Sequence, residues 1–372
     1  MYDYQIFWDQ EYGGPSRYFI NLAKHLTQTE EINICAPFYI NNYLREIPKD
    51  IIYGLKISKL FPKNFPIKFK NSLINPIFES LNKKLSNRFC KKNNPDIVHK
   101  TYFKDGEKKN KPVVVTVYDL VHEKFFKEYN RDEFYRPKKE ALESADKIIC
   151  ISNNTAKDLK EFYNIDNKKI ETIYLGNSLK DNFKNTQNNQ SMKKFEKDYL
   201  LFVGKRRGYK NFLNFLKAYS YSDNLKKNFI IICFGSMKFT KEEILEFKKL
   251  KLNQENIIHV NGDDKLLSEY YMNAKALIYP SLYEGFGLPI LEAMSFNCPV
   301  ICSNTGSIPE VGGEAVEYFD PYDIDAMSEK INKIVSDDSK LKNLIAKGQI
   351  HQKLFSWQKC SNQTLDLYKK LF

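Results

Sequence analysis

Two glutamates, Glu284 and Glu292, lie in a stretch whose glycines and proline could build a site for a phosphorylated sugar. The stretch reads PSLYEGFGLPILEAM and follows a short apolar run typical of a buried strand. Pro289 suits the first turn of a helix, and side chains on a helix lean towards its N-terminus. The Glu292 carboxylate can therefore return to the end where Glu284 and the amides of residues 285–287 lie, and these groups suit sugar hydroxyls and phosphate. Two carboxylates alone are more often helix caps or solvated surface, but the bracketing Gly-Phe-Gly-Leu-Pro favours a site.

A second cluster, between Gly204 and Asn211, is strongly basic. It reads GKRRGYKN and follows the apolar run YLLFV, which predicts that its cations lie at the end of a strand. These cations repel one another unless solvent screens them or an anion binds: Lys205, Arg206, Arg207 and Lys210. A diphosphate fits, because charge-assisted hydrogen bonds to phosphate are among the stronger ones in proteins. The alternative is a solvated basic turn.

Near the start of the chain, Gly13 and Gly14 precede a helical pattern over Tyr18–Leu26. Glycines at this place let the backbone approach a ligand, and the N-terminus of a helix favours an anion. A plain turn explains the pair equally well.

Short strand patterns alternate with helical patterns from end to end, and they position these clusters. Several strands are apolar on both faces, as in parallel sheets covered by helices on both sides. The alternation predicts an α/β fold with two doubly wound, Rossmann-like domains, whose ligands bind beyond the carboxyl ends of the strands and whose facing edges would form a cleft. The strands are expected at Gln5–Phe7, Val113–Val117, Lys147–Ile151, Ile170–Tyr174, Tyr199–Val203, Phe229–Phe234, Ile257–Val260, Leu277–Tyr279, Pro299–Cys302 and Ala315–Phe319.

Composition marks the boundary between the two predicted domains. Residues 181–198 are rich in Asn, Gln and Lys and nearly free of aliphatic residues, which predicts a linker. We therefore expect a first domain over residues 1–180 and a second over residues 199–354. A final amphipathic helix, residues 355–372, is expected to return to the first domain. A chain of 372 residues suits two such domains.

Charge and cysteine content narrow the class of protein. The net charge is +12, and residues 49–111 hold 16 Lys/Arg against 5 Asp/Glu. The basic excess therefore belongs to one surface, which disfavours general nucleic-acid binding. Seven scattered cysteines without a Cys-x-x-Cys pair indicate buried thiols in a reducing compartment. The chain start shows no signal-peptide pattern and no apolar run approaches the length of a membrane span, so we expect a cytoplasmic protein.

With these residues in view, the sequence resembles glycosyltransferase family 4, a retaining family with the GT-B fold. The Glu-x7-Glu element formed by Glu284 and Glu292 is the most specific point of similarity, and the likeness covers nearly the whole chain. It is most similar to bacterial members, often mannosyltransferases, that assemble lipopolysaccharide O-antigen and other surface polysaccharides. Further matching segments are GGPSRYF at 13–19, TVYD at 116–119, CIS at 150–152, GKRRGYKN at 204–211 and FSW at 355–357.

The resemblance implies a role for each matching residue. Arg206 and Lys210 would bind the donor diphosphate, with Lys205 competing with Arg206 for that position. Glu284 would contact hydroxyls of the donor sugar, and Glu292 the ribose. The remaining donor-binding residues would line the phosphates through their backbones: Gly13, Gly14, Gly204, Gly285, Phe286, Gly287 and Leu288.

One position departs from the family pattern. Many members have a His-Asp pair after the strand that here is Val113–Val117, and that histidine touches the transferred sugar. This chain has Tyr118 and Asp119, with the nearest histidine at His122. Either Tyr118 occupies the position or His122 reaches it from the next turn.

The implied reaction transfers a hexose from a nucleoside-diphosphate sugar to an acceptor hydroxyl with retention of configuration. Mannose from GDP-mannose is the first expectation and a UDP-hexose the second; the acceptor would be a glycan or a polyprenyl-linked glycan. No cofactor and no essential metal are expected, because Asp263 and Asp264 are not an Asp-x-Asp motif and better suit a helix cap. The remaining alternatives are a GT-B nucleotide-sugar epimerase or hydrolase and a nucleic-acid-binding protein that uses the basic segment 49–111. Oligomeric state is left open.

The same basic segment interleaves its cations with apolar residues and could rest on an anionic membrane surface, where a lipid-linked acceptor would lie. A solvated face over an ordinary core is the alternative. The apolar residues concerned are Phe61, Phe65, Phe69, Leu73, Ile77, Phe78 and Phe89.

Overall fold

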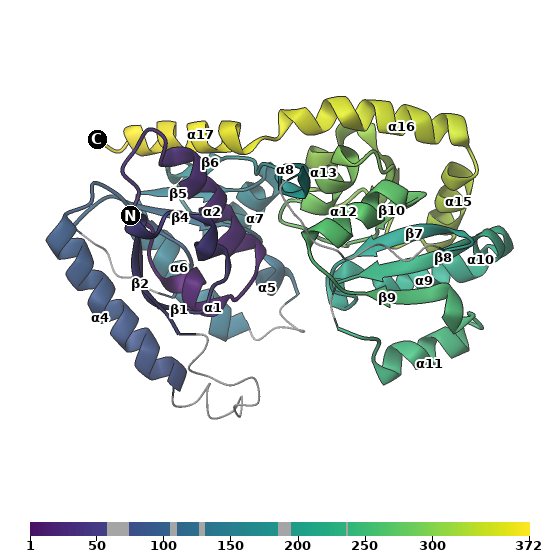
Figure 1. Cartoon of the computed structure of the whole chain (residues 1–372), viewed down its shortest axis with the longest axis horizontal. Helices are drawn as coiled ribbons and strands as arrows, with labels where there is room; N and C mark the ends of the chain where they lie inside the picture. Colours follow the sequence, from purple (N-terminus) through teal and green to yellow (C-terminus); the bar gives the residue numbers. More distant parts are fainter. Residues whose placement is uncertain (58–73, 105–109, 126–130, 185–194, 236) are drawn as a thin grey trace. The chain divides into compact units, whose positions relative to one another are not determined.

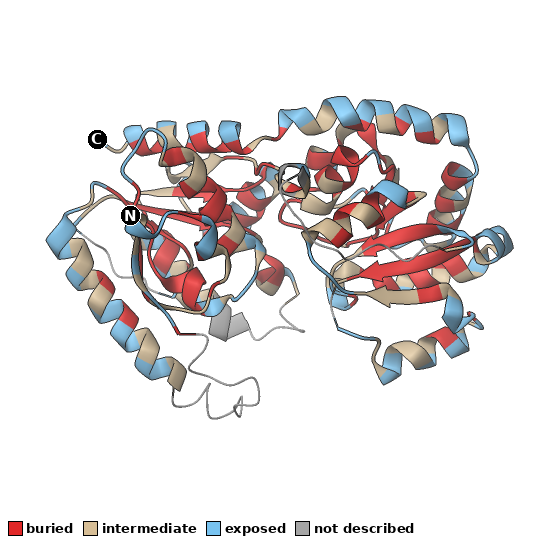
Figure 2. Ribbon diagram, in the orientation of Figure 1, coloured by how far each residue is buried: buried red, intermediate tan, exposed pale blue. Residues whose placement is uncertain are grey.

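The computed structural model describes residues 1–57, 74–104, 110–125, 131–184, 195–235 and 237–372 (Figure 1). The chain divides into two compact units. Unit 1 comprises Met1–Tyr174 with Trp357–Phe372, and unit 2 comprises Leu175–Ser356. Each unit is built on a parallel sheet with helices packed against it, so the predicted α/β fold with two Rossmann-like domains is confirmed. The strands of both sheets are largely buried (Figure 2).

The sheet of unit 1 consists of parallel strands in two groups that Tyr2 joins. One group pairs β1 with β2, and the other has the order β3-β4-β5-β6. Tyr2 forms bridges to Ile34 in β1 and His99 in β3. The bounds are β1 (Ile34–Tyr39), β2 (Ile52–Lys56), β3 (Val98–Lys100), β4 (Val113–Val117), β5 (Lys147–Cys150) and β6 (Ile170–Thr172).

The predicted strand at Gln5–Phe7 is wrong, because these residues form the helix α1 (Gln5–Asp9). The side chain of Thr101 decides the conformation. Its hydroxyl oxygen accepts from the Ile6 amide at 3.0 Å and its own hydroxyl donates to the Asp3 carboxylate at 2.6 Å. A partner almost a hundred residues away therefore satisfies the Ile6 amide in the first turn of α1, where no preceding helical carbonyl can reach it.

The final helix returns to unit 1, as predicted. Helix α17 (Trp357–Lys369) packs on α2 (Gly14–Leu26), with the rings of Tyr18 and Trp357 6.0 Å apart. The Tyr368 hydroxyl lies 2.5 Å from Nδ1 of the buried His99, which connects the helix to β3. Burial lowers the pKa of His99 to about 3, so this histidine is a neutral core residue. The other helices are α4 (Asn75–Asn93), α5 (Val121–Lys124), α6 (Arg131–Ser144) and α7 (Asn153–Tyr163).

Helix α4 carries part of the predicted basic surface. Of the apolar residues named for that surface, Phe61, Phe65, Phe69 and Leu73 lie outside the described residues. Phe78 stacks on Trp8, with ring centroids 5.4 Å apart, and Phe89 lies 4.7 Å from the ring of Tyr53. Ile77 and Leu81 are exposed. Among the helices of the described residues, none combines the length and apolar character of a membrane span.

Unit 2 contains a six-stranded parallel sheet of order β12-β11-β10-β7-β8-β9. The strand order reverses between the neighbours β7 and β10, and ligands of doubly wound sheets bind at the carboxyl ends of strands at such a point. The bounds are β7 (Asp198–Val203), β8 (Phe229–Phe234), β9 (Ile257–Val260), β10 (Ala276–Tyr279), β11 (Val300–Ser303) and β12 (Glu317–Phe319).

Helices cover both faces of this sheet, and alternate strand residues pack against them. Phe202 and Ile278 belong to a core that α9 and α15 complete, whereas the Tyr199 hydroxyl donates to the Tyr270 carbonyl in α12 at 2.7 Å. The helices are α8 (Leu179–Lys184), α9 (Phe212–Tyr221), α10 (Asp223–Asn228), α11 (Lys241–Lys249), α12 (Asp264–Asn273), α13 (Leu288–Ser295), α14 (Ile308–Gly312), α15 (Ile324–Val335) and α16 (Asp338–His351). Short 3₁₀ turns span Tyr43–Glu46, Lys49–Ile51, Asn167–Lys169, Gly208–Lys210, Gln254–Asn256, Gly313–Ala315 and Gln352–Leu354.

The predicted linker, residues 181–198, begins inside α8 and ends on the first residue of β7, whereas the division between the two units falls after Tyr174. Residues 181–184 complete α8, and residues 185–194 lie outside the described residues.

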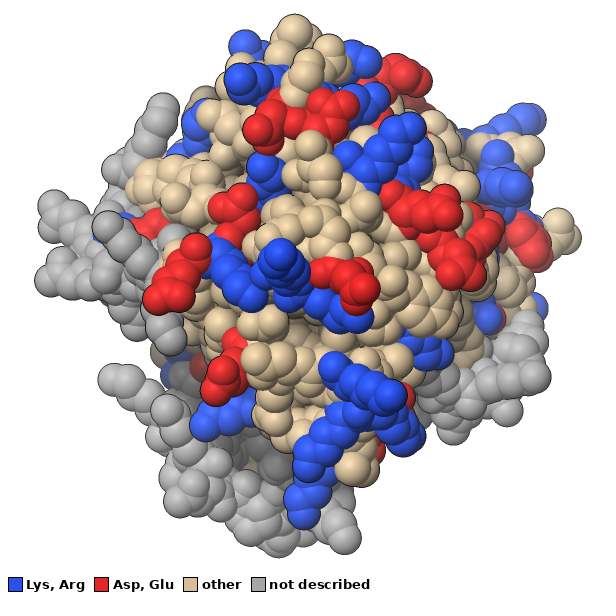
Figure 3. Space-filling view, turned by 90° about the vertical axis from the view of Figure 1, so that its right-hand side faces the viewer, with Lys and Arg blue, Asp and Glu red and all other residues tan. Residues whose placement is uncertain are grey.

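The surface of the side shown in Figure 3 mixes Lys/Arg with Asp/Glu side chains. Ion pairs of unit 2 such as Lys226–Asp223 at 2.8 Å and Lys340–Glu317 fit this mixture.

Candidate functional site

The two clusters singled out in the sequence lie at the carboxyl ends of the neighbouring strands β7 and β10. The loop over residues 204–211 follows β7, and the loop over residues 280–287 follows β10. They are joined by the Leu282 amide, which donates to the Tyr209 carbonyl at 2.7 Å. The candidate site of unit 2 therefore lies where the strand order reverses.

Lys210 and Glu284 form the centre of this site. The Lys210 ammonium donates to both carboxylate oxygens of Glu284, at 2.7 and 3.0 Å. Both side chains are mostly buried, with exposed fractions of 16% and 10%. Ser307, the residue before α14, supports the loop, because its hydroxyl lies 2.9 and 2.8 Å from the carbonyl oxygens of Glu284 and Phe286 and can donate to either. The arrangement holds one cation and one carboxylate in a fixed place at the end of β10.

Gly287 ends this loop and is the N-cap of α13. Its φ of +119° is a conformation that L side chains rarely adopt, so a glycine is needed there. Leu288 is the first residue of α13 and Pro289 lies in its first turn, as predicted. Phe286 is buried, with its ring 5.9 Å from that of Phe355. The helix N-terminus can thus present backbone N–H groups to an anion at the end of the sheet.

Glu292 lies about one turn into α13 and is held from the neighbouring helix. The hydroxyl of Tyr271 in α12 donates to its Oε2 at 3.0 Å. Tyr271 is fully buried, and burial together with the Glu292 charge raises its pKa well above the ordinary value. The tyrosine therefore stays protonated and orients the carboxylate.

Replacing Tyr271 with phenylalanine is expected to raise the KM for the sugar donor by about fivefold with little change in kcat. The variant loses one hydrogen bond that orients Glu292, the carboxylate that the family resemblance predicts to bind the donor ribose, and such a bond contributes about 1 kcal/mol. Steady-state kinetics with varied donor measure the effect. Tyr219→Phe is the matched control, because its hydroxyl bonds to the Phe229 carbonyl at 2.7 Å elsewhere in unit 2. An unchanged KM would contradict a role for Tyr271 in the site.

Arg206 is engaged away from Glu284. Its Nε donates to Oε1 of Glu243 in α11 at 2.8 Å, and one terminal nitrogen donates to the Met237 carbonyl at 2.6 Å. Its guanidinium also lies 4.6 Å from the ring centroid of Phe239. The side chain is 3% exposed, whereas its neighbour Lys205 is exposed. Of the predicted diphosphate-binding cations, Lys210 therefore forms an ion pair with Glu284, and Arg206 forms one with Glu243.

The predicted residues of unit 1 follow β4. Tyr118 is buried, and its hydroxyl has no hydrogen-bond partner among the residues that the structure describes. The Asp119 carboxylate accepts from the Val121 amide at 3.2 Å. The backbone carbonyl of Asp119 accepts from the Lys138 ammonium at 2.8 Å. His122 is half-buried in α5. Tyr118 therefore offers a donor at the carboxyl end of the sheet.

A buried ion pair supports the segment that carries these residues. Lys138 in α6 lies 3.2 Å from the Glu123 carboxylate, and both side chains are almost fully buried. The hydroxyl of Tyr163 donates to the same carboxylate.

The two predicted glycines lie at the start of α2, where Gly13 precedes the first turn and Gly14 is its first residue.

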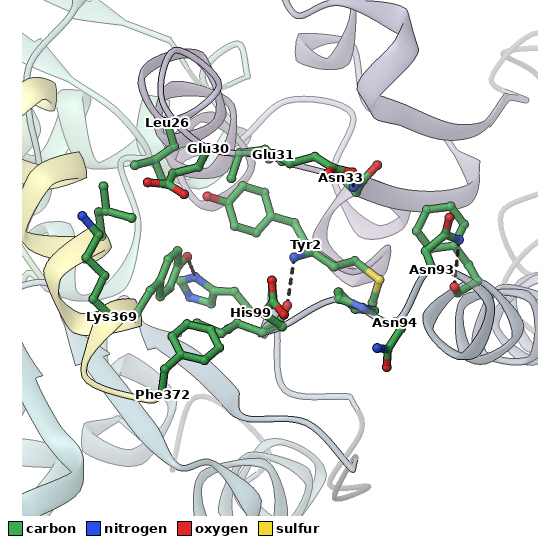
Figure 4. A pocket seen from close by; sticks show the side chains of 18 residues that line it. Tyr2, Leu26, Glu30, Glu31, Asn33, Asn93, Asn94, His99, Lys369 and Phe372 are labelled. Atoms are coloured by element: carbon green, nitrogen blue, oxygen red, sulfur yellow. Dashed lines mark hydrogen bonds between the residues drawn. The ribbon is translucent and has the colours of Figure 1, made fainter.

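A cavity also opens in unit 1, among residues from α2, β3 and α17 (Figure 4). Glu30, Asn33, Lys369, Tyr2 and His99 are among the residues that line it. Asn33 and Ile97 immediately precede β1 and β3, so the cavity lies at the amino ends of the strands. It is therefore separate from the Tyr118 end of the sheet, where ligands of such folds bind.

Sequence reasoning missed Tyr271, Tyr279, Ser307 and Glu243. Tyr271 and Tyr279 lie in apolar patterns that indicate core residues. Glu243 lies in a highly charged segment, a pattern typical of a solvent-exposed helix. The expected cap at Asp263 is confirmed, because its carboxylate accepts from the Leu266 amide at 2.9 Å at the start of α12. Among the described residues, no three His, Cys, Asp or Glu side chains gather closely enough to hold a metal ion.

Comparison with known families matches both units. The family described as Glycosyltransferase Family 4 matches residues 12–180, and the family described as Glycosyl transferases group 1 matches residues 183–351. Between them these two matches cover most of the chain.

Individual relatives agree with these matches. The chain is 33% identical to O-antigen chain mannosyltransferase B of Escherichia coli over 239 residues, which make up 62% of each chain. It is 25% identical to the serotype-specific mannosyltransferase WbdA of Escherichia coli over 304 residues, 74% of this chain and 37% of the relative. The matches therefore span less than two thirds of these relatives. The crystal structure of WaaG, a glycosyltransferase involved in lipopolysaccharide biosynthesis, shares the fold with a TM-score of 0.70 at 15% identity, covering 99% of this chain and 98% of that one.

Proposed function

Because the chain belongs to the glycosyltransferases of group 1 and family 4, we propose that it transfers a hexose from a nucleoside-diphosphate sugar to an acceptor hydroxyl with retention of configuration. The observation that carries the proposal is the pairing of Lys210 with Glu284 where the strand order of unit 2 reverses. One residue suits a diphosphate and the other suits sugar hydroxyls. Their present contact keeps both charges compensated without a ligand.

The proposed reaction requires that the negative charge developing on the leaving diphosphate be stabilised. The transition state resembles an oxocarbenium ion, and negative charge grows on the departing phosphate oxygens. Lys210 and the N-terminus of α13 lie at the same end of the sheet and would be preorganised for that charge. Lys205, which is exposed in the loop after β7, would supply a further cation. In front-face transfer the leaving oxygen accepts the proton of the incoming hydroxyl, so no covalent nucleophile is required.

The two carboxylates divide the sugar contacts. Glu284 would bind hydroxyls of the transferred hexose, and Glu292, oriented by Tyr271, would bind the ribose. In unit 1, Gly13 and Gly14 would lie near the phosphates, and the partnerless Tyr118 hydroxyl would donate to the transferred sugar in place of the family histidine. His122 remains the alternative for that contact.

The donor and acceptor follow from the relatives as proposals. Mannose from GDP-mannose is the first choice, because the relatives above are mannosyltransferases, and a UDP-hexose is the second. The acceptor would be a glycan or polyprenyl-linked glycan in surface-polysaccharide synthesis. We further propose that no divalent metal is required, since cations and amides supply the countercharge. Loss of turnover with a chelator, restored by magnesium or manganese, would contradict this.

A thermal-shift panel of GDP, UDP, ADP and their sugars tests the proposed function. A ligand at 100 times its Kd stabilises the protein by about 2.7 kcal/mol, which identifies the base. The selected donor is then supplied with and without an acceptor glycan. Release of nucleoside diphosphate that depends on the acceptor supports transfer, whereas release without any acceptor indicates a hydrolase or epimerase. A panel without any stabilising nucleotide would contradict the proposal.

Binding of unit 1 to an anionic membrane surface is expected to depend on α4. Its described residues include five Lys/Arg and one acidic residue, Glu79. Replacing Lys83, Lys84, Arg88 and Lys91 with glutamine should lower affinity for phosphatidylglycerol vesicles at least 100-fold, since each cation near such a surface contributes about 1 kcal/mol. Vesicle co-sedimentation at physiological salt measures this. If the unaltered protein ignores anionic vesicles, the membrane role fails.

A further inference from the structure

Tyr279 is a buried residue of the candidate site whose hydroxyl lies beside Glu284 without a well-aligned hydrogen bond. It is the last residue of β10 and is 1% exposed. Within the described part of the chain, its hydroxyl makes no hydrogen bond of good geometry, although it lies within reach of the Glu284 carboxylate. A buried polar group left without a partner is costly, and native structures keep few of them. Its presence at the end of a central strand therefore calls for a reason.

The neighbours of this tyrosine are the central residues of the site. The Lys210 ammonium lies 5.7 Å from the centre of the phenol ring while it bonds to Glu284. A side chain on Gly287 would lie 3.9 Å from the ring edge, so the ring packs beneath the start of α13. Burial first, the Glu284 charge second and the side-chain contact with Glu284 third raise the pKa of Tyr279 well above the ordinary value. The phenol therefore remains a proton donor beside the carboxylate.

The Lys210–Glu284 pair is the arrangement without a ligand. If the chain binds a nucleoside diphosphate as proposed above, its phosphates offer more negative charge than one carboxylate and compete for the ammonium. Glu284 is 8% exposed, so once Lys210 turns towards the phosphates the carboxylate loses its counterion without gaining water. A mostly buried carboxylate in that state needs another donor.

We propose that Tyr279 is a positioning residue that donates its hydroxyl to Glu284 when the donor diphosphate draws Lys210 away. This inference rests on the proposed function and deepens it. Lys210 and Tyr279 then serve the same carboxylate in turn, and Glu284 stays aimed at the sugar in both states. The unsatisfied hydroxyl of the unliganded protein is a donor held ready for the liganded one.

The proposal couples nucleotide affinity to a residue that does not touch the nucleotide. The hydroxyl completes its hydrogen bond to Glu284 only on binding, so Tyr279→Phe should raise the Kd for the nucleoside diphosphate by about five- to tenfold, the value of one hydrogen bond. The unliganded variant should melt about 2 °C higher, because it no longer buries an unpaired hydroxyl. Isothermal titration with GDP, UDP and ADP and thermal melts of the full chain measure both.

Tyr199→Phe is the matched control. Its hydroxyl is also buried in the sheet of unit 2 but already bonds to the Tyr270 carbonyl at 2.7 Å. This variant should melt at a lower temperature and bind the nucleoside diphosphate with unchanged affinity. If Tyr279→Phe behaves like the control, with lower melting temperature and unaltered Kd, the hydroxyl is merely structural and the proposal is overturned.

A double-mutant experiment decides the proposal without any ligand. Lys210→Met removes the ammonium, so Tyr279 should already donate to Glu284 in the empty protein. Adding Tyr279→Phe to the Lys210→Met variant should then lower the melting temperature. In the wild-type background, the same Tyr279→Phe substitution should raise the melting temperature. An effect of the same sign in both backgrounds would overturn the proposal. If the wild-type chain binds no nucleoside diphosphate, the proposed function fails, while this reversal of sign still reports on Tyr279.

Discussion

Replacing Lys210 with methionine is expected to slow sugar transfer by about 10²–10³-fold at saturating donor. The ammonium now bonds to both oxygens of Glu284 at the end of β10. In the proposed reaction it faces the charge that grows on the leaving diphosphate, and loss of one preorganised donor in comparable sites costs a factor of this size. Single-turnover rates with the donor selected by the nucleotide panel measure the effect.

A matched lysine separates this effect from the loss of any ion pair. Lys226 pairs with Asp223 at 2.8 Å on the surface of the same unit. Lys226→Met removes the same chemical group, and surface pairs contribute little, so its rate should stay within about twofold of wild type. Full transfer activity in Lys210→Met would remove the electrostatic basis of the proposed mechanism.

The strands of this chain could be predicted wherever a run of apolar, β-branched residues lies between breaks in the pattern. Val113–Val117, Phe229–Phe234 and Ile257–Val260 have the bounds that the sequence predicts. The sequence pattern does not predict strands β1 to β3 of unit 1, and at Gln5–Phe7 it predicts a strand where the structure has the helix α1. Short segments of this kind are decided by distant contacts, such as that of Ile6 with Thr101, which periodicity does not report.

The candidate site divides in the same way. Spacing and turn chemistry were enough to bring Glu284, Gly287 and Lys210 to one end of the sheet. Tyr271 and Tyr279 could not be distinguished from core residues, because their roles depend on where a single hydroxyl lies. The partner of Arg206 could not be predicted either, since Glu243 lies 37 residues away in another helix. The sequence shows how many cations a basic segment holds. It does not show which of them form ion pairs with carboxylates elsewhere in the fold.

Replacing Arg206 with methionine is expected to lower the free energy of unfolding of unit 2 by about 3 kcal/mol, which corresponds to a melting temperature about 6–12 °C lower. The reason is that Glu243 would be left as a mostly buried carboxylate without its cation; the two side chains are 3% and 15% exposed. Lys205→Ala should instead leave the melting temperature unchanged and raise the donor KM, because Lys205 is exposed. Thermal melts and donor kinetics of the two variants separate a positioning cation from a ligand-binding one.

The second substitution that completes this test is Glu243→Gln. Glu243 also accepts from the Thr240 amide at 2.7 Å in the capping box of α11, and glutamine preserves that bond while removing the charge. Arg206→Met combined with Glu243→Gln should therefore recover more than half of the lost stability, since neither partner leaves a buried charge behind. Without recovery, the ion pair would not explain the loss. A normal melting temperature with abolished donor binding in Arg206→Met would instead assign Arg206 to the diphosphate.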